Sequence, residues 1–526
     1  MKLLLTILST ILICSQFTNS LRILAVFPLN GRSHWIMAES VLTSLAKRGH
    51  KVDAVTHFPI KDPPPNYRDI SLEGSIQTMV NYMKPSNISQ INIQDFKFLT
   101  DIAGHKICQL MEFPTLKELI DNPPKDPPYD LVIVEVFMMP CYLAFGRHLN
   151  VPMVAMMTAN FQEWFSDIIG TPHNPAYMPS LFSSYDQRMT FWERLMNTFQ
   201  TNMVSFQLNY YLSEQEVYLK KYFGLNATIS ELYGDIAIML INSHHSLNGI
   251  SPKIPSLIEI GGVHVKNDST PLPSDLQKWL DESTHGCIFF TFGSMVRIET
   301  FPDPLLRTFY KVFEKLAPVR VLMKVAKKED LLPGLPKNVM IKSWFPQVPI
   351  LKHKNTKAFL THGGLLGTQE AIYFGVPVIG IPLFGDQYNN LQIAAKKHIG
   401  VTLNSIENVN EETLSDAINT ILYNDTYRTN MKKLSQLFKD RPMSAVDTAI
   451  FWVEYVGRHG NILQSPLFHL NWWQRNLLDV YGFILACVAL ILYVAFVLIR
   501  KLKNCLLGHT YCHEKGGKSS NSKKNK

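Results

Sequence analysis

Two short apolar runs joined by a helical pattern constrain the fold more than any other part of the chain. They occupy residues 357–361 and 376–381 and carry no charge apart from the lysine that opens the first. Strands this apolar are typical of parallel sheets, in which strands alternate with helices that cover both faces. A His-Gly-Gly turn at 362–364 ends the first run, and a helical pattern over 365–374 follows at once. The segment predicts an α/β domain.

The turn between that strand and that helix is suited to bind an anion. A chain that passes through Gly363 and Gly364 into a helix exposes backbone N–H groups and the positive end of the helix dipole. His362 opens the turn, and five further side chains of the same segment are candidate ligand contacts: Trp344, Gln347, Glu370, Asp386 and Gln387. Each alone has an ordinary structural explanation. Together they predict a site for a phosphate-bearing nucleotide with a sugar attached.

Each of these side chains suits one part of such a ligand. Glu370 lies six residues past Gly364, far enough along the helix to reach a ribose. Asp386 and Gln387 follow the second strand and its turn, and a carboxylate beside an amide suits the hydroxyl groups of a sugar ring. Trp344 could stack on the face of a base, as aromatic side chains do.

The chain of 526 residues is too long for one core and predicts two α/β domains. In the first half, apolar strands at 22–27 and 51–56 flank a polar turn and a helical pattern at 35–48, which is how a doubly wound sheet opens. Further strands are expected at 129–137 and 151–158. In the second half, expected strands at 287–292, 319–325, 339–343, 357–361 and 376–381 alternate with helical patterns at 303–316, 347–353, 365–374 and 387–397.

We expect the two domains to face each other across a cleft, with a donor in one and an acceptor in the other. Two stretches of the first half, 59–128 and 161–225, are irregular or rich in aromatic residues. They could build an apolar pocket, or be ordinary helical core or a contact with a membrane surface. The expected division is a signal peptide at 1–20, an acceptor domain at 21–245, a linker at 246–275, a donor domain at 276–455, a return segment at 456–479, a transmembrane helix at 480–499 and a basic tail at 500–526.

The sequences at both ends of the chain indicate that the protein is targeted to a membrane and anchored in it. Residues 1–20 combine a basic start, an apolar stretch and a polar end, as in a secretory signal cleaved near Ser20; an uncleaved anchor or a core helix is the alternative. Residues 480–499 carry no charge and are long enough to cross about 30 Å of hydrocarbon, unless they form a buried core helix. Trp472 and Trp473 precede them, as in an interfacial belt. This predicts a single-pass type I protein whose domains are luminal.

The net charge of +8 lies almost wholly in the tail. Residues 500–526 hold eight Lys or Arg and one Glu, and the body between signal and tail is neutral. This is a positive-inside membrane pattern and argues against nucleic-acid binding. Lys523 and Lys524, fourth and third from the end, resemble the dilysine signal that returns membrane proteins to the endoplasmic reticulum. A basic disordered tail is the alternative.

The chain has too few cysteines for a disulfide-rich scaffold, and it contains sequons that could be glycosylated in the lumen. Between the signal and the membrane segment only Cys108, Cys141 and Cys287 occur, so at most one disulfide can form there. No CxxC pair or zinc spacing is present. N-glycosylation sequons stand at Asn87, Asn226, Asn267 and Asn424.

His34 is the candidate catalytic base. It follows the first strand, at the edge where doubly wound sheets bind ligands, and a histidine can take a proton near neutral pH. Glu135, near the carboxyl end of another strand, is the candidate partner that would fix the tautomer of that histidine. A solvated loop histidine and a carboxylate with another partner are the alternatives. Ser294 follows a strand and a glycine, so it could hold phosphate oxygens or belong to a plain turn.

Missing motifs narrow the class of protein. No GxGxxG follows the first strand and no GxxxxGK[ST] occurs, which argues against dinucleotide oxidoreductases and P-loop proteins. No DxD occurs, which argues against sugar transfer that depends on a carboxylate-bound metal. No GxSxG occurs, which argues against a lipase-type esterase.

These features together resemble the membrane-bound animal UDP-glycosyltransferases, the family of detoxifying glucuronosyl- and glucosyltransferases. The likeness spans nearly the whole chain, and the donor signature that begins at Trp344 carries it. Residues 170–179 and 362–371 are similar to the insect branch, which mostly uses UDP-glucose. The resemblance implies the two-Rossmann fold called GT-B, a UDP-sugar as co-substrate, no separate cofactor or metal, and a small lipophilic acceptor. It leaves room for a homo-oligomer.

The resemblance also assigns roles to the candidate residues. His34 would be the catalytic base and Glu135 its partner. The donor would be held by Ser294, His362, Gly363 and Gly364 at the diphosphate, Glu370 at the ribose, Trp344 and Gln347 at the uridine, and Asp386 and Gln387 at the sugar hydroxyls. Two positions depart from the family pattern: Leu365-Leu366-Gly367 stand where many members have Asn, and Glu135 stands where many have Asp.

The expected function is inverting, metal-independent transfer of a hexose from a UDP-sugar to a hydroxyl of small lipophilic acceptors. Glucose is the expected sugar, with glucuronate as the alternative. Two rivals remain: an enzyme dedicated to an endogenous lipid or hormone, and a UDP-sugar-binding protein without turnover. The sequence does not identify the acceptor.

Overall fold

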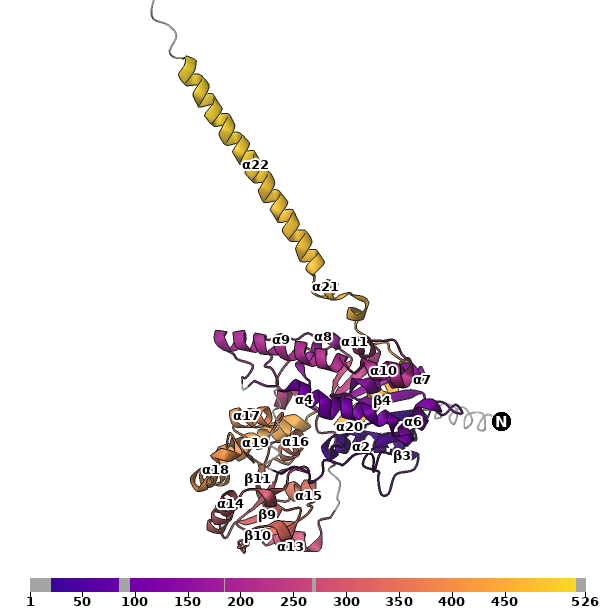
Figure 1. Cartoon of the computed structure of the whole chain (residues 1–526). Coiled ribbons are helices and arrows are strands. Elements are labelled where there is room, and N and C mark those ends of the chain that lie inside the picture. Colours follow the sequence, from indigo (N-terminus) through magenta and orange to yellow (C-terminus); the bar gives the residue numbers. More distant parts are fainter. Residues whose placement is uncertain (1–19, 85–94, 184, 267–270, 517–526) are drawn as a thin grey trace, which may run out of the picture. The chain divides into compact units, whose positions relative to one another are not determined.

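The computed structural model describes residues 20–84, 95–183, 185–266 and 271–516. The chain divides into two compact units, residues 1–464 and 465–526. Figure 1 shows the first unit as an α/β body and the second as a long helix with a short approach. The predicted signal peptide, the dilysine-like end and the sequons at Asn87 and Asn267 lie outside the described residues.

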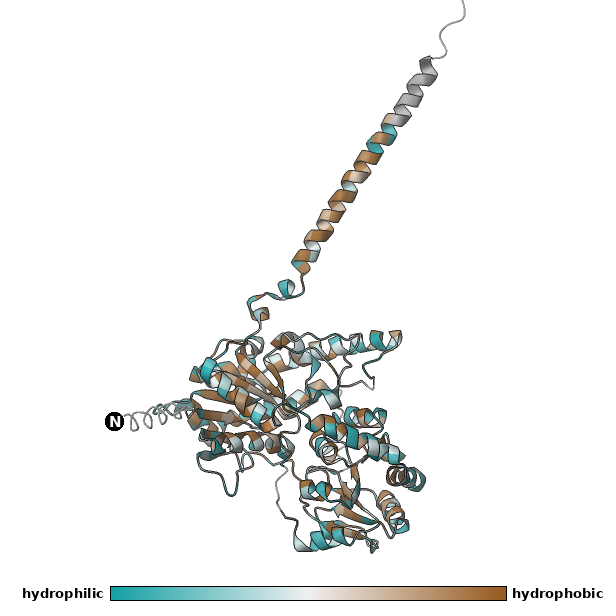
Figure 2. Cartoon of the chain, turned by 180° about the vertical axis from the view of Figure 1, so that it is seen from behind, coloured by the Kyte–Doolittle hydropathy of each residue, from teal (hydrophilic) through white to brown (hydrophobic). Residues whose placement is uncertain are grey.

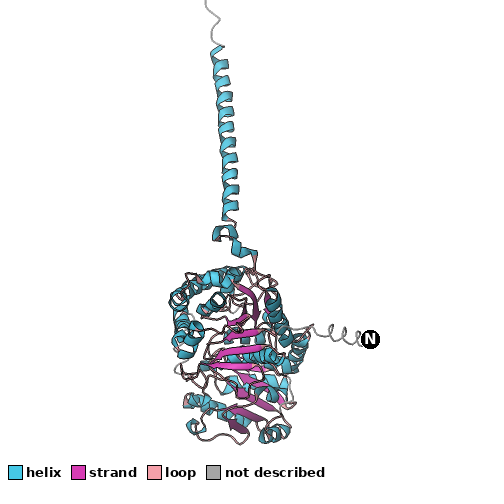
Figure 3. Ribbon diagram, turned by 90° about the vertical axis from the view of Figure 1, so that its right-hand side faces the viewer, coloured by secondary structure: helices cyan, strands magenta, loops and turns pink. Residues whose placement is uncertain are grey.

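The first sheet has seven parallel strands in the order β3-β2-β1-β4-β5-β6-β7 (Figure 3). Its central strands β1, β4, β5 and β6 are apolar and almost wholly buried because helices cover both faces. The pairs Ala25↔Ile133 and Ile133↔Val154 place the carboxyl ends of β1, β4 and β5 side by side. The strands are β1 (Arg22–Val26), β2 (Lys51–Thr56), β3 (Tyr67–Ser71), β4 (Leu131–Glu135), β5 (Met153–Met157), β6 (Ile236–Ile241) and β7 (Leu257–Glu259).

The helices of this half include one long element, α9, and a disulfide connects two parts of the irregular region. Cys108 and Cys141 form that disulfide, with their Cα atoms 6.2 Å apart, and Cys287 is a free buried thiol. The helices are α2 (Arg32–Lys47), α4 (Phe96–Thr100), α5 (Lys106–Cys108), α6 (Pro114–Asp121), α7 (Ala144–Leu149), α8 (Ser166–Ile169), α9 (Phe191–Ser213), α10 (Glu216–Phe223), α11 (Ile229–Gly234) and α12 (His245–Asn248).

The second sheet has six parallel strands in the order β10-β9-β8-β11-β12-β13. Each strand predicted in this half is present, with bounds within three residues of those expected. The strands are β8 (Cys287–Thr291), β9 (Arg320–Lys324), β10 (Val339–Lys342), β11 (Thr356–Thr361), β12 (Val378–Gly380) and β13 (Gly400–Thr402). The helices are α13 (Ser274–Asp281), α14 (Asp303–Lys315), α15 (Gln347–Lys352), α16 (Leu365–Phe374), α17 (Gln387–Lys396), α18 (Glu411–Tyr423) and α19 (Asp425–Lys439).

The chain then returns to the first sheet. Helix α20 (Ala445–His459) packs on α2, β5 and β6, and its buried residues Ala449, Ile450 and Val453 belong to the core of the first half. The expected domain boundary at residue 455 falls inside this helix, and the expected linker at 246–275 contains β7. The first half is therefore built from both ends of the unit.

The second unit contains a helix that is long and apolar enough to cross a membrane. α21 (Trp472–Arg475) precedes α22 (Leu478–Gly516), whose residues 478–505 form the candidate span. Figure 2 colours the apolar residues of α22 brown. The predicted segment at 480–499 lies within this span.

Candidate active site

The candidate base and its partner meet at the carboxyl ends of the first sheet. His34 lies in the first turn of α2, directly after the loop that follows β1, and Glu135 ends β4. The Nδ1 atom of His34 is 2.6 Å from Oε1 of Glu135. Because a carboxylate can only accept, Nδ1 carries the proton and Nε2 is left to receive one.

Thr158 completes this arrangement and was missed at the sequence level. It follows β5, and its hydroxyl lies 2.7 Å from Nδ1 of His34 and 3.5 Å from Oε1 of Glu135. The Glu135 side chain is 1 % exposed, whereas that of His34 is 22 % exposed. The second oxygen of Glu135 has no hydrogen-bond partner in the described part of the chain. The hydrogen bonds of the Glu135 carboxylate therefore go to His34 and Thr158, and the imidazole of His34 remains partly exposed to solvent.

The phosphate turn depends on three glycines packed around His362. Gly363 has a φ of +85°, and a Cβ there would lie 2.4 Å from Leu391. A Cβ on Gly364 or Gly293 would lie within 3 Å of the His362 imidazole ring. Gly364 is the N-cap of the ten-residue helix α16, so the free N–H groups of its first turn begin here.

His362 is a neutral donor at physiological pH. Burial lowers the pKa of His362 to about 4, and the positive charge of Lys324 contributes in the same direction. A neutral imidazole offers one N–H to a phosphate oxygen without adding charge. The positive charge of this site has to come from elsewhere.

Lys324 supplies that charge and was also missed at the sequence level. It ends β9 and is 6 % exposed, and its Nζ donates to Gly293 O and to Asn81 Oδ1, both at 2.8 Å. Burial lowers the pKa of Lys324 to about 8. Nζ also lies 5.9 Å from the centre of the Trp344 ring, which is 54 % exposed and open for stacking. The available sequence signal was a lysine that ends a strand with an apolar centre.

Ser294 lies where the two halves of the unit touch. Its carbonyl accepts a hydrogen bond from the Asn81 N–H at 2.8 Å, and Met83 forms a parallel bridge with Val296. A short piece of the first half therefore pairs with the loop that follows β8. The predicted phosphate contact Ser294 thus sits beside Lys324 and Gly293.

Glu370 is a buried carboxylate with two polar neighbours. Gln347 Nε2 donates to Glu370 Oε2 at 2.6 Å, so these two predicted residues are in direct contact. His264, from the stretch expected to be a linker, places Nε2 3.5 Å from Glu370 Oε1 and 3.1 Å from Leu366 O. Burial raises the pKa of Glu370 to about 7 and lowers the pKa of His264 to about 4. A neutral His264 holds the first turn of α16, and Leu365 points into the core.

Asp386 and Gln387 open α17 beside the glycine turn. The Nδ2 atom of Asn390 bridges Asp386 Oδ2 at 2.9 Å and Gly363 O at 3.0 Å. Gln387 Oε1 accepts the N–H groups of Leu383 and Phe384, which leaves its NH₂ group to donate. Burial raises the pKa of Asp386, and an electrostatic interaction with His34 opposes this shift.

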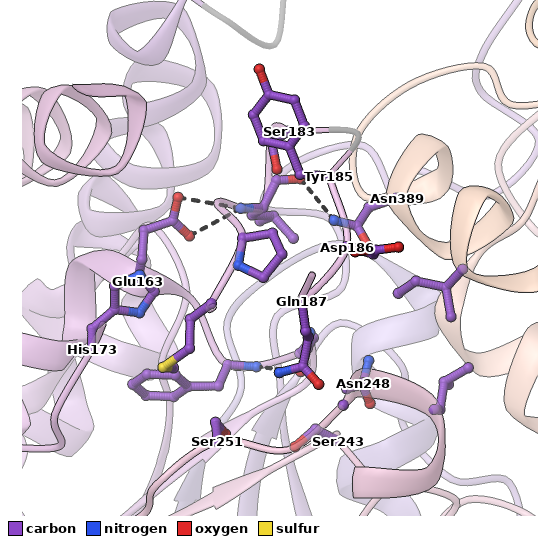
Figure 4. Close-up of a pocket in the computed structure, with 18 of the residues that line it drawn as sticks. Glu163, His173, Ser183, Tyr185, Asp186, Gln187, Ser243, Asn248, Ser251 and Asn389 are labelled. Atoms are coloured by element: carbon purple, nitrogen blue, oxygen red, sulfur yellow. Dashed lines mark hydrogen bonds between the residues drawn. The ribbon is translucent and has the colours of Figure 1, made fainter. Parts of the chain in front are cut away.

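A cavity of about 370 Å³ is lined by the segment that follows β5 and by helix α17 (Figure 4). Asn160 and Phe161, two and three residues beyond Thr158, line it, as does Asn389 of α17. Asn389 Nδ2 donates to Leu181 O at 3.3 Å and joins α17 to the opposite wall. Figure 4 shows polar side chains such as Glu163 and Gln187 among the lining residues. The cavity is thus more polar than the apolar pocket expected from residues 161–225.

Binding of the nucleotide sugar expected from the sequence should depend on pH through two groups of this site. Glu370 accepts hydroxyl protons best when ionised, and its pKa of about 7 predicts affinity that rises as pH increases through 7. Lys324 attracts a diphosphate only when protonated, and its pKa of about 8 predicts affinity that falls above pH 8. We expect the tightest binding between these values, with a change of up to about tenfold per pH unit outside them.

Isothermal titration with UDP-glucose measures this dependence, because its diphosphate diester does not titrate in the range. Glu370→Gln should remove the acidic limb and Lys324→Gln the alkaline limb. If affinity still falls at low pH in Glu370→Gln, a group other than Glu370 causes the acidic limb.

This fold and site define a class of protein. Two parallel Rossmann-like sheets are the architecture of GT-B glycosyltransferases. Among solved structures, the glycosyltransferase VinC in complex with dTDP is similar over 84 % of this chain and 100 % of its own, with a TM-score of 0.56 and 16 % identity. The glycosyltransferase of kitacinnamycin covers 84 % of this chain and 98 % of its own, with a TM-score of 0.52 and 15 % identity.

The family follows from sequence comparison. Residues 76–519 match the family described as "UDP-glucoronosyl and UDP-glucosyl transferase". UDP-glucosyltransferase 2 of Dactylopius coccus is 37 % identical over 535 residues, covering 100 % of both chains. UDP-glucuronosyltransferase 1A9 of Mus musculus is 29 % identical over 538 residues, covering 98 % of this chain and 97 % of its own. The chain belongs to the UDP-glucuronosyl and UDP-glucosyl transferase family and is a UDP-glycosyltransferase enzyme, as predicted.

Proposed function

We propose that this UDP-glycosyltransferase transfers glucose, with inversion and without a metal, from UDP-glucose to a hydroxyl group of small lipophilic acceptors. The observation that carries the proposal is the 2.6 Å contact between His34 and Glu135. Asp386, beside the glycine turn, interacts electrostatically with His34. A base on one side and an anion site on the other are what direct displacement of a nucleoside diphosphate needs.

In the proposed reaction the acceptor hydroxyl oxygen attacks the anomeric carbon and the bond from that carbon to the UDP oxygen breaks. His34 Nε2 takes the hydroxyl proton, and the resulting imidazolium is stabilised by Glu135. Negative charge grows on the departing diphosphate. The N–H groups at the start of α16, His362 and Lys324 are placed to stabilise that charge.

We propose that each part of the donor is bound by the residues that the sequence analysis assigned to it. Glu370 would bind the ribose, Trp344 and Gln347 the uridine, and Asp386 with Gln387 the sugar hydroxyls. The contact between Gln347 and Glu370, and the orientation of the Gln387 amide with its NH₂ group left to donate, support these roles. Gly363 and Gly364, with Ser294, would line the diphosphate.

Glucose is proposed because the relative that shares 37 % identity along both chains is named a UDP-glucosyltransferase. Relatives named UDP-glucuronosyltransferases share 27–30 % identity. The test is competition between UDP-glucose and UDP-glucuronate in microsomes that contain the chain, with a panel of small phenols and products identified by mass. Preferential glucuronide formation would replace glucose as the donor sugar.

We propose that the acceptor occupies the cavity beside Thr158. Phe161, Met178 and Ile393 supply apolar wall, and the polar residues named above would bind substituents of the acceptor. A cavity with both polar and apolar lining residues could accept varied compounds, which agrees with a role in detoxification. Screening of acceptors is the test of that role.

Filling this cavity should separate acceptor use from donor binding. Ile393→Trp places a large ring in the cavity from α17, and we expect acceptor kcat/KM to fall by about tenfold or more, because a misplaced acceptor loses orientation. The dissociation constant of UDP-glucose should stay unchanged, and Ile393→Val, which leaves the cavity open, is the matched control. Equal kcat/KM in both variants would place the acceptor elsewhere.

We propose that the chain is a single-pass type I protein of the endoplasmic reticulum, with both sheets in the lumen. The apolar span at 478–505 and the basic residues that follow it support this topology. Asn226 and Asn424 are exposed, so both sequons that fall in the described chain are accessible to glycosylation. Asn424 also caps α19 through its side chain.

A further inference from the structure

A short segment of the first half, residues 77–83, runs from the loop that precedes His34 to the second half, and we call it the strap. At its start, Asn30 Nδ2 donates to Gln77 O at 2.6 Å. The N–H of Met79 donates to Asn30 O at 3.0 Å. Asn30 lies four residues before His34, in the loop that follows β1. The strap is therefore tied to the loop that leads to the candidate base.

The other end of the strap pairs with the loop that follows β8. The N–H of Asn81 donates to Ser294 O at 2.8 Å. The N–H of Met83 donates to Met295 O at 2.9 Å, and Met83 O accepts the N–H of Arg297 at 3.0 Å. These backbone hydrogen bonds hold the strap beside the candidate phosphate contact Ser294.

The side chain of Asn81 contacts the buried ammonium group of Lys324. Lys324 Nζ donates to Asn81 Oδ1 and to Gly293 O, both at 2.8 Å. Because an ammonium group has three N–H donors, these two acceptors leave one donor for a ligand oxygen. One acceptor comes from the first half and the other from the second half. The direction of the remaining N–H is therefore set by both halves together.

The backbone of Asn81 explains how one residue makes both contacts. Its φ of +49° lies in the left-handed region, which Asn and Gly adopt more readily than other residues. In this conformation the N–H reaches Ser294 O while the side-chain oxygen reaches Lys324. A glycine can adopt the same backbone conformation, so the role of the side chain can be separated from the path of the strap.

We propose that Asn81 is a positioning residue for the donor, which acts by holding the Lys324 ammonium group toward the diphosphate. This inference rests on the proposed function, in which Lys324 stabilises the departing UDP. Charge-assisted hydrogen bonds to phosphate depend on geometry, and the two acceptors of Nζ fix that geometry before the donor binds. The half that carries His34 would then also supply part of the site for the leaving group.

The charged groups around Lys324 are occupied by other partners. Burial lowers the pKa of Lys324 to about 8, and the charge of Glu299 opposes this shift. Glu299 already accepts three hydrogen bonds, and His362 is neutral. Lys342, the neighbour of Lys324 in the register of β10 and β9, lies 2.6 Å from Asp275. Replacing Asn81 with Gly thus changes the hydrogen bonding of Nζ without removing a charge.

Titration of UDP into the full chain in lipid nanodiscs tests the proposal. The range is about pH 7.5 to about pH 9.5, where the terminal phosphate of UDP, with a pKa of about 6, stays ionised. Asn81→Gly removes an acceptor that favours the ammonium form. We expect binding about tenfold weaker near pH 8, with the alkaline limb moved to lower pH.

Two further variants make the pH readout specific. Asn81→Asp keeps the shape of the side chain but adds a negative charge, which stabilises the ammonium and repels the diphosphate. Binding should therefore weaken while the alkaline limb moves to higher pH. Asn66→Gly is the matched control, because Asn66 is exposed in the turn before β3 and has a φ of +66°. It should bind UDP as the parent chain does.

The outcomes separate this inference from the function on which it rests. If Lys324→Gln binds UDP like the parent chain, Lys324 is not a donor contact, and that part of the proposed function falls together with the inference. If Lys324→Gln weakens binding but Asn81→Gly does not, the donor contact stands and the role of Asn81 is wrong. If Asn81→Gly weakens binding equally at every pH, the residue serves only the fold of the strap, which also overturns the proposal.

Discussion

Replacing His34 with Ala should reduce glycosyl transfer by about 10²–10⁴-fold or more, because the acceptor hydroxyl loses the group that takes its proton. The imidazole is the only titratable ring in contact with Glu135 among the described residues, so no neighbour can substitute for it directly. UDP-glucose should bind with unchanged affinity, because its proposed contacts lie in the second half of the unit. The measurements are kcat with a reactive phenol and the dissociation constant of UDP-glucose by titration.

His285→Ala is a suitable control for this variant, since His285 is exposed and lies in a turn remote from the candidate site residues. Transfer in His34→Ala at the rate of the parent chain would remove His34 from the role of base. Loss of UDP-glucose binding would instead mean that the substitution disturbs the cleft.

Glu135→Gln should cost nearly as much as removal of the base, up to about 10⁴-fold in kcat. The amide has the shape of the carboxylate but not its charge, so the imidazolium that forms during the reaction is no longer stabilised. The amide can also present N–H₂ to Nδ1 and favour the wrong tautomer. The effect should fall on kcat, with the KM for UDP-glucose unchanged.

Two further variants make this prediction specific. Glu135→Asp keeps the charge but shortens the side chain by one methylene, so it should retain more activity than Glu135→Gln. The double variant His34→Ala with Glu135→Gln should be no slower than His34→Ala alone, because the two residues act as one unit. Additive losses would show that Glu135 acts on something other than His34.

The second half of the fold could be predicted closely because its strands are continuous apolar runs and its helices begin at glycine or polar turns. The helix at 365–374 has the predicted bounds, and α17 differs by one residue. β3 was missed because its sequence YRDIS is polar, as suits an edge strand, and β7 and β13 are only three residues long. β6 was missed too, although its sequence IAIMLI is a continuous apolar run. The docking of α20 on the first sheet depends on a contact between distant parts of the chain, which no local pattern reports.

In the site, too, local sequence patterns predicted some residues, while others depend on contacts between distant parts of the chain. His34 and Glu135 could be paired in advance because parallel strands end at one edge, and the structure brings them together. Thr158, Lys324 and His264 were missed because their importance comes from what lies beside them: a second strand end, the loop of another strand and the start of α16. Leu365-Leu366-Gly367 stand where many family members have Asn, so the proposed contacts to the diphosphate are backbone N–H groups, His362 and Lys324.

The most direct test of the central claim is to incubate the full chain, in lipid nanodiscs, with UDP-glucose and a small phenol and to follow both UDP release and the anomeric configuration of the product. We predict stoichiometric release of UDP and formation of a β-glucoside, the inverted product, from the parent chain and not from His34→Ala. Binding of UDP-glucose without a glycoside for any member of a broad phenol panel, or formation of an α-glucoside, would contradict the account.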